Sequence, residues 1–81
     1  MRIEVVGDGH IFAGTPTQIL VQMKSLAFGA EHQTLREYIE GNVANIRRGF
    51  GIEFKLTGGT DEELAESFLQ QMLDGGHARR L

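Results

Sequence analysis

The first fifteen residues carry the alternating pattern of a β-hairpin. Residues 2–6 alternate polar and apolar side chains and are rich in β-branched residues, which is typical of a strand. The dipeptide Asp8-Gly9 predicts a two-residue turn, because both residues tolerate positive φ. Such a turn places Val5 opposite Phe12 and Ile3 opposite Gly14. The residues expected on the core face are Ile3, Val5 and Phe12, and those expected on the outer face are Glu4, Val6, Ile11 and Ala13.

Three Thr-x-x-Gln/Glu sequences mark the starts of helices. They begin at Thr15, Thr34 and Thr60, and in each the fourth residue can return a hydrogen bond to the threonine backbone as a capping box. Apolar residues then recur with helical spacing. The expected core stripes are Ile19, Leu20, Met23, Leu26 and Ala27 in the first helix, Leu35, Tyr38, Ile39, Val43 and Ile46 in the second, and Leu64, Ala65, Phe68, Leu69 and Met72 in the third.

Two large apolar residues of the first helix fall outside its stripe. At about 100° per residue, Val21 and Phe28 point away from the core, with Lys24 beside them. Either the second helix covers Val21 while Phe28 folds inward, or both residues face a partner. Within the second helix, Asn42 interrupts the stripe, and close packing against the first helix is one explanation for Gly41.

Residues 52–56 alternate cleanly and predict a third strand, with Ile52, Phe54 and Leu56 inward. The element order is then ββααβα. Two antiparallel helices between strands two and three favour a third strand parallel to the first, and this register pairs Arg2 with Glu53 and Glu4 with Lys55. We therefore predict an α+β domain at residues 1–76: a two-layer ββααβα fold with a mixed sheet in the order 2-1-3 and three helices on one face. Residues 77–81 are expected to form a flexible C-terminal tail.

Composition narrows the class of protein. With 81 residues and 41% hydrophobic residues, the chain is expected to fold as one small domain. It has no cysteine, no leader-like start and no apolar run of the roughly 20 residues that a membrane helix needs. We therefore expect a cytoplasmic protein with no membrane contact.

Candidate chemistry is sparse. His10, His32 and His77 have no spacing that predicts a shared metal site. Ser25 and Ser67 lie in predicted helices with no histidine at a spacing that would activate them. Acidic residues follow Gly58-Gly59-Thr60, which argues against a phosphate loop. We therefore expect no cofactor and no enzymatic activity.

Two functional hypotheses remain. The first is a binding or accessory module that acts through protein–protein contact, with a homodimer as one form. Its candidate surface consists of Val21, Lys24, Phe28, Val6 and Ile11. The alternative is a nucleic-acid-associated regulator whose basic patch consists of Arg47, Arg48, Arg79 and Arg80. A net charge of −3 disfavours general nucleic-acid binding, so this alternative requires the two arginine doublets to share one face.

Overall fold

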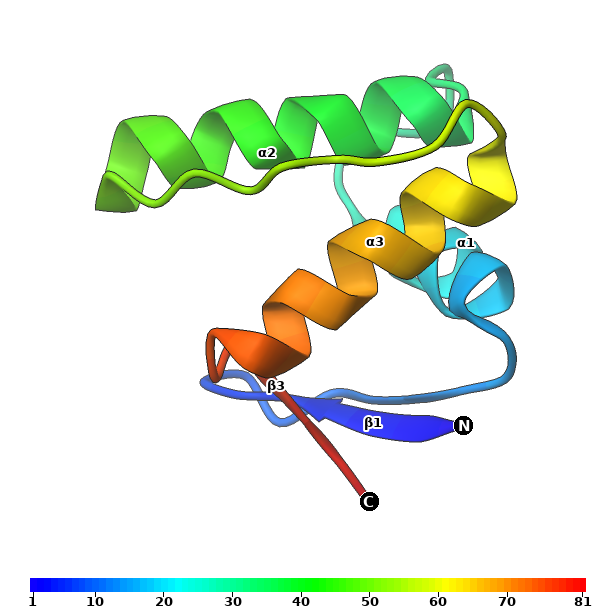
Figure 1. The fold of residues 1–81 in the computed structure, drawn as a ribbon. Coiled ribbons are helices and arrows are strands. Elements are labelled where there is room, and N and C mark those ends of the chain that lie inside the picture. Colours follow the sequence, from blue (N-terminus) through cyan, green and yellow to red (C-terminus); the bar gives the residue numbers. More distant parts are fainter.

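A computed structural model describes residues 1–81, with two strands, three helices and a final strand (Figure 1). The sheet order is β2-β1-β3. The elements are β1 (Arg2–Val5), β2 (Ile11–Ala13), α1 (Pro16–Leu26), α2 (Leu35–Phe50), α3 (Asp61–Asp74) and β3 (Ala78–Arg80). The α+β class and the 2-1-3 order are thus confirmed.

All three capping boxes form, and each starts its helix at the predicted residue. In the first box the Thr15 hydroxyl accepts from the Gln18 amide at 3.2 Å, and Gln18 Oε1 accepts from the Thr15 amide at 2.9 Å. The same reciprocal pairs open α2 at Thr34 and α3 at Thr60. Gly51 ends α2 with φ of 70°, a left-handed conformation that suits glycine. These ends are set locally, by residues three positions apart.

The third strand is not the predicted one. Strand β3 comes from Ala78–Arg80, the segment expected to be a loose tail, and it pairs antiparallel with β1 rather than parallel. Glu4 lies opposite Arg79 in this register, and Arg79 Nε donates to Glu4 Oε1 at 2.6 Å. Ala78 is buried beneath α3. The chain therefore has the element order ββαααβ.

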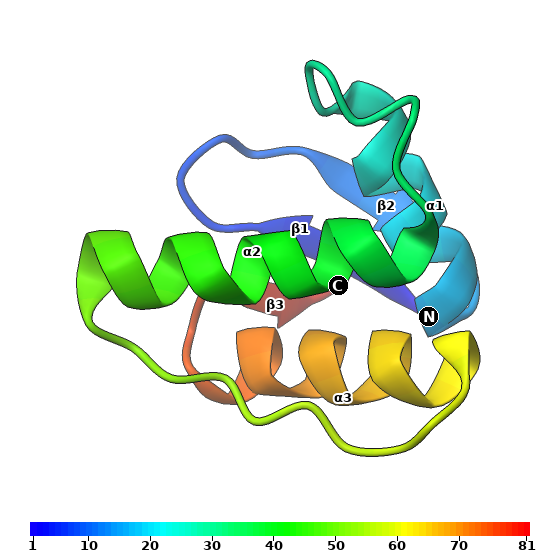
Figure 2. The ribbon, with the colours of Figure 1, turned by 90° about the horizontal axis from the view of Figure 1, so that it is seen from above.

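Residues 52–57 form an extended segment, here called the strap, that belongs to no sheet (Figure 2). Its backbone bonds to side chains of α3: Gln71 Nε2 donates to the Lys55 carbonyl and Gln71 Oε1 accepts from the Lys55 amide, both at 2.6 Å. Phe54 is buried, with its ring centroid 5.3 Å from that of Phe68. Of the residues predicted inward, Phe54 is buried and Leu56 is half-buried against the helices, whereas Ile52 is exposed. The predicted strand at residues 52–56 is wrong: the segment pairs with no strand, and the backbone of Lys55 bonds Gln71 of α3 instead.

The predicted charge pairs between strands are also wrong, because residues 52–56 do not form a strand beside β1. Glu53 lies 3.7 Å from Arg47 of α2, and Glu4 is held by Arg79. Neither Arg2 nor Lys55 makes an ion pair. The acidic side chains thus find basic partners, but on other elements.

The hairpin has a longer loop than Asp8-Gly9 predicts. Ile3 pairs with Phe12 rather than with Gly14, and residues 6–10 form the connection. Asp8 keeps negative φ, and its carboxylate accepts from the His10 amide at 2.9 Å. A two-residue turn of the predicted type needs positive φ at both central positions. The register therefore shifts by two residues, which leaves the paired residues on their predicted faces, while Val6 lies in the connection.

The molecule has three layers rather than two (Figure 1). Helices α1 and α3 lie on one face of the sheet, and α2 lies on α1 and α3 without contacting a strand. The expectation that all three helices pack on the sheet is therefore wrong for α2. The other face of the sheet is uncovered. The buried core, centred between the layers, consists of Ile3, Phe12, Ile19, Leu20, Ile39, Phe54, Leu64, Ala65, Phe68, Leu69, Met72 and Ala78.

Candidate functional site

The outer side of α1 and the turn after it expose large apolar side chains. The relative accessible surface of Phe28 is 108%, which means that the residue is fully exposed, and that of Val21 is 50%. Helix α2 therefore does not cover Val21, and Phe28 does not fold inward. Leu26, which the sequence assigns to the core stripe, is also exposed, because the last turn of α1 extends past the core. Lys24 is half-buried beside them.

The second predicted apolar pair belongs to a different layer. Val6 and Ile11 are exposed, with Ile11 opposite Glu4 in the ladder on the uncovered face of the sheet. An ion pair between Glu4 and Arg79 crosses that face. The structure therefore divides the five predicted contact residues between the α1 layer and the sheet.

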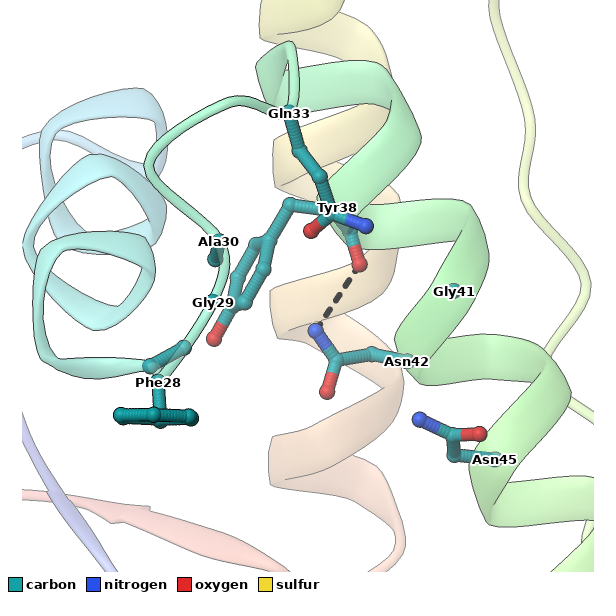
Figure 3. A pocket seen from close by; sticks show the side chains of 9 residues that line it. Phe28, Gly29, Ala30, Gln33, Tyr38, Gly41, Asn42 and Asn45 are labelled. Atoms are coloured by element: carbon teal, nitrogen blue, oxygen red, sulfur yellow. Dashed lines mark hydrogen bonds between the residues drawn. The ribbon is translucent and has the colours of Figure 1, made fainter.

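A groove of about 250 Å3 runs between residues 27–33 and α2, next to Phe28 (Figure 3). Gly29, with φ of 81°, turns the chain so that Phe28 stands on one wall. The other wall is a face of α2. A Cβ at Gly41 would meet no atom within 4 Å, so close packing does not explain this glycine. The lining residues are Ala27, Phe28, Gly29, Ala30, Gln33, Tyr38, Gly41, Asn42 and Asn45.

The groove presents amides and a phenol. Asn42 Nδ2 donates to the Tyr38 carbonyl at 2.9 Å, and Arg48 donates to Asn45 Oδ1 at 2.6 Å. Burial raises the pKa of the Tyr38 phenol above its ordinary value, with the Asn42 amide acting in the opposite direction. The phenol is therefore neutral throughout the physiological range. Since no lining residue carries a charge, the groove suits a neutral polar group.

The two arginine doublets lie in different layers. Arg47 and Arg48 end α2, whereas Arg79 and Arg80 belong to β3, which α2 does not contact. Most of these guanidinium groups already have partners: Arg47 pairs with Glu53, Arg48 with Asn45 and Arg79 with Glu4. The two doublets therefore lie on elements that do not contact each other.

The remaining polar candidates have structural partners. His10 Nδ1 lies 3.3 Å from Asp8 Oδ1 on the hairpin loop, and no three His, Cys, Asp or Glu side chains come together. The Ser67 hydroxyl donates to the Leu64 carbonyl and accepts from the Thr57 amide of the strap. Glu63 accepts from the backbone amides of Thr60 and Gly59, which lowers the pKa of its carboxyl. The contacts of these groups therefore stabilise the local structure around them.

The sequence did not single out Asn45 or Gln33 as site residues. The signal for Asn45 was the pair Asn42 and Asn45, two amides three positions apart that share a helix face. No helix of the structure combines the length and hydrophobicity of a membrane span. No family model matches the chain, and no curated protein or solved structure matches it either.

Proposed function

We propose that this protein is a small non-enzymatic binding module that acts through protein–protein contact. The supporting observation is the full exposure of Phe28 at the rim of the groove, with Val21 on the outer side of α1. Burying a phenylalanine side chain contributes about 1.5–3 kcal/mol. A domain of this size has about 3–5 kcal/mol of net stability in all. Leaving Phe28 outside the core therefore gives up a large contribution that a partner can recover on binding.

The contact surface consists of Phe28 as anchor with Val21, Lys24 and the groove beside it. A standard interface buries roughly 800 Å2 on each partner, so Phe28 alone is not sufficient. Aromatic anchors beside a pocket are typical of the residues that dominate binding energy. The partner is a different protein or a second copy of this chain.

The test compares Phe28→Asp with Phe50→Asp. Phe50 is the matched control because it is also strongly exposed but does not line the groove. We expect proteins captured from the native host by the wild-type chain to be lost with Phe28→Asp and retained with Phe50→Asp. Light scattering across a concentration series reports self-association in the same three proteins. Two results together would contradict the proposal: light scattering shows a strict monomer, and Phe28→Asp captures the same proteins as the wild-type chain.

A further inference from the structure

We propose that two copies of this chain associate through β2, whose free edges pair antiparallel and join the two sheets into one. The two-fold axis passes between the two Phe12 residues, so Ile11 of each copy lies opposite Ala13 of the other copy. This inference goes beyond the proposed function, because β2 belongs to the sheet and not to the surface around Phe28.

The free edge of β2 presents backbone groups that no strand binds. Strand β2 is an outer strand of the sheet, beside α1 (Figure 2). Successive residues of an antiparallel strand direct their N–H and C=O groups alternately toward the neighbouring strand and away from it. The Val5 amide donates to the His10 carbonyl at 2.9 Å, so residue 10 faces β1. The groups of Ile11 and Ala13 therefore point away from β1. Gln22 of α1 confirms this direction, since its Nε2 donates to the Ala13 carbonyl at 2.8 Å.

Strand β2 is complementary to itself about Phe12. With Ile11 opposite Ala13 of the other copy, each outward N–H meets an outward C=O on both sides of the axis. A carbonyl oxygen has two lone pairs, so the bond from Gln22 to Ala13 is kept. The side chains of Ile11 and Ala13 lie on the uncovered face, where both are exposed. Pairing therefore adds backbone bonds and an apolar contact between copies.

The charges on the two outer strands distinguish their edges. Strand β3 contains Arg79 and Arg80, whereas β2 contains no charged residue. Charged side chains on an edge strand are a device that prevents pairing with another chain. Two β3 strands would bring arginines opposite arginines, and Ala78 is in addition buried beneath α3. Both strands are equally short, so charge and burial protect the β3 edge and leave the β2 edge open.

Symmetry selects β2 of the second copy over β3. Pairing of β2 with β3 of the next copy leaves a free edge at each end and builds an open filament, whereas pairing of β2 with β2 closes about a two-fold axis. The closed dimer has β3 as both outer strands, and these carry the protecting arginines. When a strand of a different protein is added to a sheet, side-chain pockets and charges provide the specificity. Strand β2 has no polar or charged side chain for this purpose, while its own copy supplies the complement.

The side of α1 next to β2 adds apolar surface. Gln22 reaches the Ala13 carbonyl, and Leu26 lies one turn further along the same helix face. The relative accessible surface of Leu26 is 62%, so it extends the contact made by Ile11. Short paired strands bury less than the roughly 800 Å2 per partner of a standard interface. We therefore expect a dimer whose population depends on protein concentration.

The experiment measures the dimer dissociation constant of the full chain by sedimentation across a concentration series. The decisive variant is Ala13→Pro, which removes an N–H that points away from β1 and therefore spares the ladder within the chain. Its matched control is Arg80→Pro, which removes an outward N–H from the β3 edge in the same way. We expect Ala13→Pro to raise the dissociation constant by about tenfold or more. We expect Arg80→Pro to leave it within about twofold.

A second pair of variants keeps every backbone N–H. Ile11→Lys places a charge at the paired edge and should raise the dissociation constant by about tenfold or more. Val6→Lys is its control, since Val6 is similarly exposed but lies outside β2. Amide hydrogen exchange locates the contact and monitors folding of each variant. In the wild-type protein, exchange at Ile11 and Ala13 should slow as protein concentration rises, and exchange at Arg80 should not.

The outcomes separate this inference from the proposed function. A strict monomer at the concentrations used for NMR would overturn β2 pairing, as would a dimer that persists in both Ala13→Pro and Ile11→Lys. Capture of other proteins that depends on Phe28, by a strict monomer, would reject β2 pairing while leaving the proposed function intact. Ala13-dependent capture of a different protein by a strict monomer would assign the edge to that protein and overturn self-pairing.

Discussion

Replacing Gln71 by alanine should release the strap from α3. The substitution removes two hydrogen bonds of 2.6 Å to the backbone of Lys55. Each bond of this kind contributes about 0.5–1.5 kcal/mol net, which gives about 1–3 kcal/mol for the pair. Lys55 is exposed, so water replaces part of what is lost. We therefore expect the free energy of unfolding to fall by about 1–2 kcal/mol.

Urea denaturation measures this change, and amide hydrogen exchange at Lys55 locates it. In the wild-type protein the Lys55 N–H should be protected, and in Gln71→Ala it should exchange at nearly the rate of an unstructured chain. Gln70→Ala is the control, since Gln70 bonds only the exposed Asp74 carboxylate. We expect it to lower stability by less than about 0.5 kcal/mol. Equal destabilisation by both variants, with unchanged exchange at Lys55, would refute the account of the strap.

Three further predictions follow from the described contacts. Deleting residues 78–81 removes β3. Because the total stability is only about 3–5 kcal/mol, calorimetry should show loss of the folding transition. An unchanged transition would mean that the segment is a dispensable tail. Gly41→Ala and Gly49→Ala should each stabilise α2 by up to about 1 kcal/mol in urea, because an added Cβ meets no other atom at either position. No gain in either variant would contradict this expectation. Glu63 has a lowered pKa in the folded state, so its contribution to stability is full above about pH 4.5 and is lost as pH falls through the folded pKa. Glu63→Gln should flatten that acid limb in pH-dependent unfolding, and an unaltered limb would exclude this role.

The helix starts could be read from the sequence because they depend on near neighbours. Thr15 and Gln18, or Thr60 and Glu63, lie three residues apart and satisfy each other whatever the rest of the chain does. The direction in which Val21 points from its helix likewise depends only on the helical repeat of the neighbouring residues. Its exposure follows from the absence of any covering element.

The third strand could not be read in this way because its partners are distant. Residues 52–56 alternate like a strand, but Gln71, far along the chain, binds Lys55 and holds the segment on α3. Ala78–Arg80 lacks apolar alternation, and its strand conformation depends on pairing with β1 at the other end of the chain. Side-chain periodicity indicates which face is buried; it does not say what covers that face.

The candidate site was foreseen in part for the same reason. Phe28 and Val21 could be nominated from helix geometry alone. The groove depends on the distance between residues 27–33 and α2, which is set by tertiary packing. The orientations of the Asn42 and Asn45 amides depend in turn on bonds to Tyr38 and Arg48.

Site-specific photo-crosslinking tests the central claim, that the surface around Phe28 is the protein-contact site, most directly. A benzophenone amino acid replaces Phe28 in one protein and Phe50 in another, and both are irradiated in cells of the native host. We predict one discrete protein adduct from position 28 that is absent from position 50 and diminished by Val21→Asp. Identical adduct patterns from both positions, or none from position 28, would contradict the claim.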